Sequence, residues 1–232
     1  MATSDRWRPL FHRALRAYLT RVRPSFVLGD RRYDYFWHDY NMTWRNERCV
    51  EVPIARAELT AAAGRRVLEV GNVLSHYQPV AHDILDKYER APGVWNQDVI
   101  DFAPAAPYDL IISLSTLEHV GWDETARDPD KSLRALHHLR DRCLAPGGRM
   151  LVTFPLGHHP ALDQAYGDGR LPFAESYTML RQGRFTHWRQ AAWPEVRSAK
   201  YGSPYPFANA IVIGMAVSSA NPATGASPTT GP

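Results

Sequence analysis

Two stretches of this chain decide its fold: RVLEVGNVLSHY at residues 66–77 and YDLIISLSTLEHVGWDE at residues 108–124. Each begins as a short apolar run, typical of a buried strand, and stops abruptly at small or polar residues. About one strand–helix–strand unit separates them along the chain. In an open parallel sheet such stops fall at the carboxyl ends of strands, where ligands bind. The two stretches therefore predict strands that end at a ligand-binding edge.

Outward from these stretches, strand patterns alternate with helical patterns. The expected strands are 67–70, 83–85, 94–99, 110–114, 150–154, 195–201 and 209–217. Asp128 followed by Pro129 predicts a helix start, and we expect that helix to run to about Cys143. Such alternation is typical of a mainly parallel sheet covered by helices.

Three motifs in this part of the chain resemble the class I S-adenosylmethionine-dependent methyltransferase family. VLEVG at 67–71 is similar to its first motif, DLIISLSTLEHV at 109–120 to its strand-four motif, and LAPGGRMLVTFP at 144–155 to its turn into strand five. The resemblance implies an α/β fold: a single Rossmann-like domain with a mainly parallel seven-stranded sheet, helices on both faces and a C-terminal antiparallel hairpin. It also implies an enzyme whose cofactor is S-adenosyl-L-methionine.

The chain is expected to divide into an N-terminal helical cap region at 1–64, a methyltransferase domain at 65–218 and a disordered tail at 219–232. Poor periodicity at 156–197 predicts an acceptor-side lid. A basic amphipathic helix is expected at 5–23, either packed on the domain or acting as a transit or membrane-surface segment. Residues 54–63 are alanine-rich and helical, and we expect Pro53 to interrupt any helix before them.

Composition limits the class of protein and its partners. With 232 residues the chain fits one domain, and its net charge of +3 is too small to indicate a nucleic-acid partner. Cys49 and Cys143 do not form a C-x-x-C pair, which favours a reducing compartment and a cytoplasmic location. No apolar run approaches the roughly 18 residues of a membrane span. We expect a small-molecule acceptor, no membrane association, and a monomer or homodimer.

The turn after the first strand is the predicted contact with a nucleoside-type ligand. Gly71 permits the close backbone approach that such a ligand needs. The family often has two further glycines in this turn, whereas here Asn72 to Ser75 follow; Asn72 or Ser75 is expected to bind the amino-acid arm instead. Glu69 is an acidic residue inside a parallel sheet, and the resemblance assigns it to the amino-acid end of the cofactor.

Carboxylates are expected at two further points of the cofactor. A ribose diol is held well by a carboxylate, and the resemblance places it at the end of the second strand, at Asp86 or, with a shifted alignment, Asp83. Asp98 matches the position near the adenine amino group, with Asp101 as its competitor. In all, the expected cofactor-binding residues are Glu69, Gly71, Asn72, Ser75, Asp86, Asp98, Ser115 and Thr116.

His119 is the candidate general base, because it follows the fourth strand near the expected methyl group and imidazole titrates near neutrality. Glu118 is expected to orient it or to support the fold. Tyr40, Trp44, Arg48, His158 and Trp188 are the expected substrate-binding residues. No spacing resembles a structural zinc site, and Asp123 with Glu124 is weak evidence for magnesium, so no metal is expected.

The function predicted from these features is methylation of a small-molecule hydroxyl, such as that of a sugar, a glycan or a natural product. An N-methyltransferase would carry the same cofactor motifs. A binding or scaffold protein without activity is the alternative that the altered glycine turn favours. An RNA methyltransferase lacks a visible nucleic-acid module here, and a nicotinamide-dependent oxidoreductase would need the G-x-G-x-x-G fingerprint, which this chain lacks.

Overall fold

The computed structural model describes residue 18 and residues 21–183 and 187–218. Most of the helix expected at 5–23, and the whole tail expected at 219–232, lie outside these residues. Among the described helices, none is both long enough and apolar enough to cross a membrane. Cys49 and Cys143 are buried thiols, and the Cys49 thiol donates to the Asn46 carbonyl at 2.9 Å.

The described part of the chain forms an eight-stranded sheet in the order β5-β4-β3-β6-β7-β10-β8-β9. Its strands are β3 (Val67–Val70), β4 (Asp83–Leu85), β5 (Val94–Trp95), β6 (Tyr108–Leu114), β7 (Leu144–Pro155), β8 (Glu175–Arg181), β9 (Trp188–Ala191) and β10 (Ala210–Val217). The five from β5 to β7 are parallel, and β10 runs antiparallel to both β7 and β8. The Rossmann-like α/β fold is confirmed, with eight strands instead of seven because β9 extends the antiparallel edge.

The chain order reverses direction in the middle of the sheet, between β3 and β6. From β3 the chain moves outward through β4 to β5, and it then returns to β6 on the other side of β3. Open parallel sheets bind ligands at such a switch point, outside the carboxyl ends of the strands. The topology therefore places the predicted ligand edge at the ends of β3, β4 and β6.

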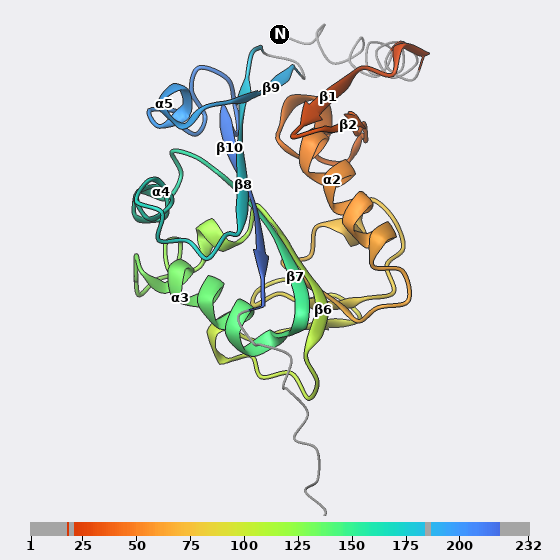
Figure 1. Ribbon diagram of the computed structural model, residues 1–232, viewed down its shortest axis with the longest axis vertical. Coiled ribbons are helices and arrows are strands. Elements are labelled where there is room, and N and C mark those ends of the chain that lie inside the picture. Colours follow the sequence, from red (N-terminus) through yellow and green to blue (C-terminus); the bar gives the residue numbers. More distant parts are fainter. Residues whose placement is uncertain (1–17, 19–20, 184–186, 219–232) are drawn as a thin grey trace, which may run out of the picture.

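Two layers cover the sheet (Figure 1). On one face lie α3 (Lys131–His138) with its continuation η5 (Leu139–Cys143), α4 (Pro160–Gly167) and α5 (Trp193–Val196). On the other lie α2 (Arg48–Ala61) and the hairpin of β1 (Ser25–Leu28) and β2 (Arg31–Asp34). Successive strand residues point to opposite faces, so Ile111 packs with Leu136 in one core and Ile112 packs with Val52 in the other. Short 3-10 turns complete the chain: η1 (Tyr40–Arg45), η2 (Leu74–His76), η3 (Val99–Asp101) and η4 (Leu117–His119).

The prediction of a strand at 195–201 is wrong. A short helix, α5, occupies its start, because Pro194 suits a first helical turn and the Glu195 carboxylate accepts a hydrogen bond from Ala192 N at 3.0 Å. The antiparallel partner of β10 is β8 instead. The segment 156–197, where poor periodicity predicted a lid, contains α4, β8, β9 and α5. The division of the chain at residue 64 stays a prediction.

Pro53 does not interrupt the helix, contrary to the expectation. It lies inside α2, which begins at Arg48. A proline inside a helix leaves the carbonyl four residues earlier without its donor. Here that carbonyl belongs to Cys49, and Phe36 N donates to it at 2.9 Å. A chain segment outside the helix thus replaces the lost hydrogen bond.

Several boundaries differ from the predicted ones: the strand expected at 94–99 is only Val94–Trp95, and the one expected at 110–114 begins at Tyr108. Two further differences have a visible cause. The helix expected after Asp128 begins at Lys131, because the Asp128 carboxylate accepts from Asp130 N and pairs with Arg134 without capping the first turn. The strand expected at 150–154 begins at Leu144, with an irregularity in its pairing to β6 that accommodates the Pro-Gly-Gly turn.

Candidate functional site

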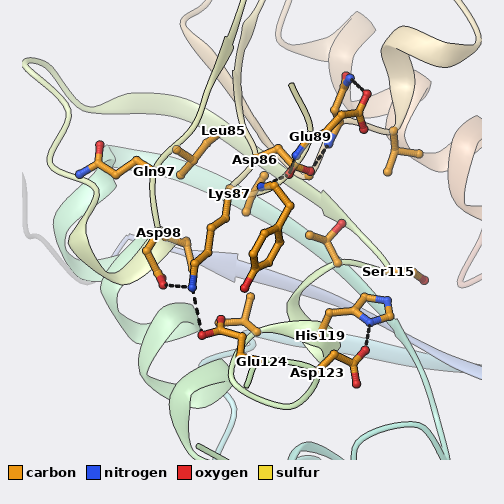
Figure 2. Close-up of a pocket in the computed structure, with 18 residues that line it drawn as sticks. Leu85, Asp86, Lys87, Glu89, Gln97, Asp98, Ser115, His119, Asp123 and Glu124 are labelled. Carbon is orange, nitrogen blue, oxygen red and sulfur yellow. Dashed lines mark hydrogen bonds and ion pairs between the residues drawn. The ribbon is translucent and has the colours of Figure 1, made fainter. Parts of the chain in front are cut away.

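A pocket of about 660 Å³ opens at the carboxyl ends of β3, β4 and β6 (Figure 2). Its volume is that of a typical small-ligand site. The turns after the three strands supply most of its walls. The lining residues after β3 are Gly71, Asn72 and Val73, those after β4 are Asp86, Lys87, Tyr88 and Glu89, and those after β6 are Ser115, Thr116, His119, Val120, Asp123 and Glu124. Gln97, Asp98 and Val99 close one side.

The first turn is built around Gly71. Its φ of +88° is a conformation that residues with a side chain rarely adopt. A Cβ at this position would lie 2.2 Å from the Thr116 hydroxyl oxygen, because the ends of β3 and β6 almost touch there. The position requires glycine for both reasons.

Glu69 stabilises this turn from below. One carboxylate oxygen accepts hydrogen bonds from Val73 N at 2.9 Å and Leu74 N at 2.8 Å, and the other lies 2.7 Å from His82 Nε2. Glu69 is fully buried and does not line the pocket, so its interaction with the amino-acid end of the cofactor, which in the family often runs through water, stays a prediction. The contacts with Val73 N and Leu74 N hold the backbone of the turn after β3 in place.

Asp86 follows β4 and lines the pocket, whereas Asp83 begins that strand and bonds to Tyr108. The Asp86 Oδ1 atom accepts from Tyr88 N and Glu89 N, both at 2.8 Å. Its Oδ2 atom accepts only from Asn72 N, at 3.2 Å, among the described residues. Asp86 therefore has one oxygen that stabilises its turn and one that retains capacity for a ligand hydroxyl.

Asn72 and Ser75 differ in their position, although both were expected to bind the cofactor. Asn72 lines the pocket and donates to Glu89 Oε1 at 2.6 Å. Ser75 is exposed, does not line the pocket, and donates to the Asn72 amide oxygen. Ser75 therefore orients Asn72 and makes no direct contact with the cavity.

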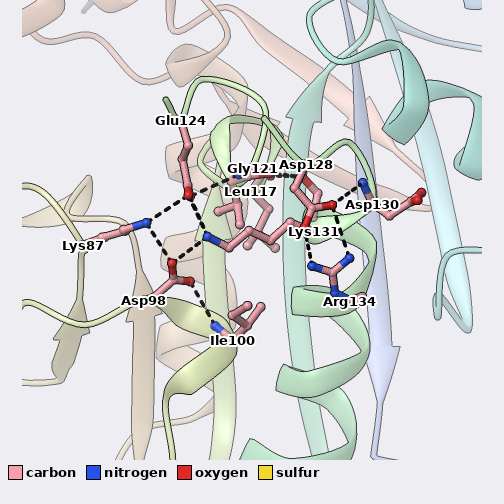
Figure 3. A network of polar contacts seen from close by, with 12 residues as sticks. Lys87, Asp98, Ile100, Leu117, Gly121, Glu124, Asp128, Asp130, Lys131 and Arg134 are labelled. Atoms are coloured by element: carbon pink, nitrogen blue, oxygen red, sulfur yellow. Dashed lines mark hydrogen bonds and ion pairs between the residues drawn. The ribbon is translucent and has the colours of Figure 1, made fainter. Parts of the chain in front are cut away.

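Asp98 belongs to an ion-pair network that joins the two sides of the pocket (Figure 3). Lys87 Nζ lies 2.8 Å from Asp98 and 3.0 Å from Glu124, and Lys131 Nζ lies 2.6 Å and 2.7 Å from the same carboxylates. Burial acts to raise the pKa of Asp98 and of Glu124, but the two lysines outweigh it and lower both values. Asp98 lines the pocket and Asp101 does not. The Asp98 carboxylate is already paired with Lys87 and Lys131, so the predicted contact of Asp98 with adenine is not its main interaction.

Residues of α2 hold the carboxyl end of β6 in place. Ser115 has a φ of +38°, and its hydroxyl donates to Glu51 Oε1 at 2.5 Å. Arg48 donates to Glu51 Oε2 at 2.5 Å and to the Leu114 carbonyl at 3.0 Å. Arg48 was expected to bind a ligand carboxylate. Its side chain is instead 14% exposed and satisfied by Glu51 beneath the pocket.

His119 lies at the pocket rim with its side chain half exposed (Figure 2). Its Nδ1 atom is 2.5 Å from Asp123 Oδ2, and His158 Nε2 is 3.3 Å from the same oxygen. Burial acts to raise the pKa of Asp123, but the contacts with His119 and His158 lower it overall. Burial, followed by the charge of His119, lowers the pKa of His158.

Asp123 thus orients His119, the role that was expected of Glu118. Glu118 is fully buried, and burial raises its pKa well above the usual value. Its Oε1 atom is 3.6 Å from His119 Nε2, and its Oε2 atom has no hydrogen-bond partner among the described residues. Glu118 therefore lies behind the histidine as a buried carboxyl group whose neutral form is favoured by burial.

The aromatic residues expected to bind substrate do not line the pocket. Trp188 and Trp44 are buried, and Trp188 N donates to the Tyr35 hydroxyl at 2.8 Å within the core. Tyr40 is half exposed and stacks on His76 at 4.7 Å, on the outside of the turn after β3. A sequence rich in aromatics does not distinguish core positions from pocket walls, because both bury large apolar rings.

Three polar residues that follow β4 were missed: Lys87, Tyr88 and Glu89. Asp123 and Glu124, which follow β6, were considered only as weak evidence for magnesium, and they line the pocket as well. The signal was present, since loops after parallel strands form the binding edge. Five carboxylates and one lysine line the pocket among the described residues: Asp86, Glu89, Asp98, Asp123, Glu124 and Lys87. The walls are consequently acidic.

No protein-family model and no curated protein sequence matches the chain. Among solved structures it is similar to the N-methyltransferase NodS from Bradyrhizobium japonicum WM9 in complex with S-adenosyl-L-homocysteine, with a TM-score of 0.43 and 14% identity over 73% of this chain and 85% of that chain. A SAM-dependent methyltransferase from Thermotoga maritima matches with a TM-score of 0.39 and 14% identity, over 71% and 88% of the two chains. The 16S rRNA (adenine(1408)-N(1))-methyltransferase from Catenulisporales acidiphilia matches with a TM-score of 0.37 and 15% identity, over 73% and 94%. Identities and TM-scores this low carry no conclusion about the reaction or substrate of this chain.

Proposed function

We propose that this chain is a methyltransferase that uses S-adenosyl-L-methionine. The observation that carries the proposal is the convergence of Gly71, Asp86 and Ser115, from three separate strand ends, on one cavity. The glycine turn permits close backbone approach by a nucleoside, and Asp86 Oδ2, which accepts from Asn72 N, retains capacity for a ribose hydroxyl. These two features fit an adenosyl compound.

The charge of the pocket favours a cationic ligand. Lys87 and Lys131 compensate the charges of Asp98 and Glu124, whereas Asp86, Glu89 and Asp123 have no lysine partner in that network and would repel the phosphates of a dinucleotide. S-adenosyl-L-methionine carries a sulfonium and an ammonium group against a single carboxylate. The acidic walls therefore support this donor over a nicotinamide dinucleotide, in addition to the missing glycine fingerprint.

When bound, the cofactor supplies an electrophilic methyl carbon with a neutral thioether as leaving group. His119 supplies the proton acceptor for the second reactant. The Asp123 carboxylate contacts His119 Nδ1, so the proton of an acceptor hydroxyl would pass to Nε2, which lies 3.6 Å from the Glu118 carboxyl group. This dyad supports O-methylation of a small molecule such as a sugar, a glycan or a natural product. N-methylation is the alternative within the same class, and the cytoplasmic location and the oligomeric state stay predictions.

Calorimetric titration with S-adenosyl-L-homocysteine tests the cofactor. We expect the wild-type chain to bind it and Asp86→Asn to weaken the affinity by about tenfold, since a charge-assisted hydrogen bond is worth roughly 1.5–3 kcal/mol. Asp101→Asn is the matched control, because Asp101 is exposed and does not line the pocket. Wild-type protein that fails to bind at millimolar ligand would contradict the proposal and favour the scaffold alternative.

Replacing His119 by alanine tests the base. Once an acceptor is identified, kcat is expected to fall by about 10²–10⁴, the usual contribution of a positioned general base, while affinity for S-adenosyl-L-homocysteine changes little. His187→Ala serves as the control, since His187 is exposed and does not line the pocket. Turnover in the His119 variant equal to that of wild type would remove His119 from the reaction.

A further inference from the structure

His119, Asp123 and His158 form a cluster of possible metal ligands at the rim of the pocket. Their three ligand atoms lie within 4.8 Å of one another. His119 and Asp123 line the pocket itself, and His158 reaches the group from the loop after β7. The cluster therefore lies beside the cavity proposed for the methyl donor, on its solvent side.

We propose that this cluster binds a divalent first-row transition-metal ion, such as Zn²⁺ or Mn²⁺. Two imidazoles and one carboxylate are a common set of three protein ligands for such ions, and they leave further coordination positions open. Mg²⁺ and Ca²⁺ prefer oxygen ligands, so the two imidazoles disfavour them. The exposed side chains, 51% for His119 and 47% for Asp123, leave room for a water molecule or an acceptor.

The backbone that carries the three ligands is held in place. Asp123 N donates to the His119 carbonyl at 3.1 Å, which fixes the spacing of these two residues. Gly157, directly before His158, has a φ of +82°, and a Cβ there would lie 2.4 Å from the Ala199 carbonyl. The His158 ring also packs against Tyr201 with centroids 5.2 Å apart. These contacts present the ligands from a fixed frame, as a metal site requires.

The distances between the three side chains fit this assignment with a small adjustment. Ligand atoms about 2.0–2.1 Å from a tetrahedral ion lie roughly 3.3 Å from each other. The separation of His158 Nε2 from Asp123 Oδ2 is 3.3 Å, whereas His119 Nδ1 is 2.5 Å from Asp123 Oδ2 because a proton joins them. An ion would replace that proton, and the half-exposed side chains would rotate apart slightly.

Glu118 gives independent support from behind the cluster. A histidine ligand usually donates its other ring N–H to a carboxyl or carbonyl group. Glu118 Oε1 lies 3.6 Å from His119 Nε2, and Glu118 Oε2 is buried without a hydrogen-bond partner among the described residues. A buried carboxyl group therefore lies where an outer partner of a histidine ligand is expected.

An ion at this position would deepen the proposed function, and this part of the inference rests on that function. A hydroxyl that coordinates a divalent ion loses its proton more readily, in the way that zinc lowers the pKa of bound water to about 7. The proton would pass to solvent, and the acceptor oxygen would keep its electron pair. His119 would then serve as a ligand and the ion as the activating group.

The sequence did not predict this site, because its ligands come from separate segments. His119 and Asp123 share one loop, but His158 follows the next strand, far along the chain. No local histidine or cysteine spacing marks it. Only the parallel pairing of β6 with β7 places the two loops side by side.

Metal binding by the full chain, purified without a histidine tag and treated with a chelator, tests the site. Competition with a chromophoric chelator should show about one equivalent of Zn²⁺, and Co²⁺ should give visible absorption bands typical of a low-coordinate site. His158→Ala and Asp123→Ala should each weaken Zn²⁺ affinity by at least tenfold. His187→Ala, at an exposed histidine outside the cluster, should leave it unchanged. Equal affinity in all four proteins, or no Zn²⁺ binding at micromolar concentration, would overturn the proposal.

Failure of the metal site and failure of the proposed function give different results. Binding of S-adenosyl-L-homocysteine to the chelator-treated protein reports only on the cofactor pocket. If Zn²⁺ binds and the cofactor analogue does not, the metal site stands and the methyltransferase assignment falls. If methyl transfer proceeds equally well with and without chelator, the activating role of the ion is overturned and His119 remains the base.

Discussion

Replacing Gly71 by alanine is expected to reduce the affinity for S-adenosyl-L-homocysteine by at least a hundredfold. The new Cβ would lie 2.2 Å from Thr116 Oγ1 and 2.7 Å from Thr116 Cγ2. Thr116 cannot withdraw freely, because its hydroxyl donates to the Leu114 carbonyl at 3.0 Å. Either the turn or the end of β6 must shift, and both form pocket walls. Calorimetry on the folded variant measures the loss.

Gly93→Ala is the matched control for this change. Gly93 has a φ of +80°, close to that of Gly71, but a Cβ there would meet no atom within 4 Å. Both variants bear the same backbone strain, on the order of 1 kcal/mol, and only the Gly71 variant adds a steric clash in the pocket. Cofactor affinity preserved in Gly71→Ala, with a native circular dichroism spectrum, would show that the cofactor does not use this turn.

Lys131→Met is expected to lower the free energy of unfolding by about 2 kcal/mol at pH 7. Lys131 is 10% exposed and pairs with Asp98 and Glu124, each 14% exposed, and removing one partner leaves mostly buried charges without compensation. Lys87 still contacts both carboxylates, which keeps the loss below that of a fully orphaned charge. Methionine retains the apolar stem, so packing changes little. Urea denaturation followed by tryptophan fluorescence measures the difference.

The pH dependence of this difference identifies the network as its source. The folded pKa values of Asp98 and Glu124 are lowered, so their contribution is present above their unfolded values of about 4 and is lost as pH falls below that range. The pKa of Lys131 is raised, so its contribution is lost only as pH rises above about 10.4. The difference between wild type and Lys131→Met should therefore shrink toward pH 3.

Arg134→Met, one turn further along the same helix, is the control for the network. Arg134 pairs with Asp128 at 2.5 Å, but both side chains are exposed and the pair is screened by solvent (Figure 3). It should change stability much less than Lys131→Met at every pH. If the two variants lose the same free energy, or if the loss from Lys131→Met persists at pH 3, the ion pairs are not its source.

The strands at the binding edge could be predicted because their signal is local. The strand β4 has the predicted bounds, and β3 and β6 lie where apolar runs meet polar stops. The need for glycine at position 71 followed from the same pattern, since a chain that turns sharply after a buried strand has few other choices.

The predictions that proved wrong concern residues whose structure depends on contacts with distant parts of the chain. Pro53 is tolerated because Phe36 supplies the missing donor, and β8 rather than residues 195–201 pairs with β10. Trp188 reads as a pocket aromatic, but its contact with Tyr35 places it in the core. Each outcome depends on a contact between segments that local propensity does not encode.

By itself, the sequence determined which segments become parallel strands and where each one stops. The tertiary structure alone decided which polar groups at those stops remain available to a ligand. Glu69 and Asp86 are both carboxylates beside the same turn, yet Glu69 is saturated by Val73, Leu74 and His82, whereas Asp86 retains one oxygen toward the cavity. The physical reason is that a hydrogen bond requires a distance of about 3 Å between its donor and acceptor atoms. The folded chain brings these groups together, and their order in the sequence does not reveal which pairs will meet.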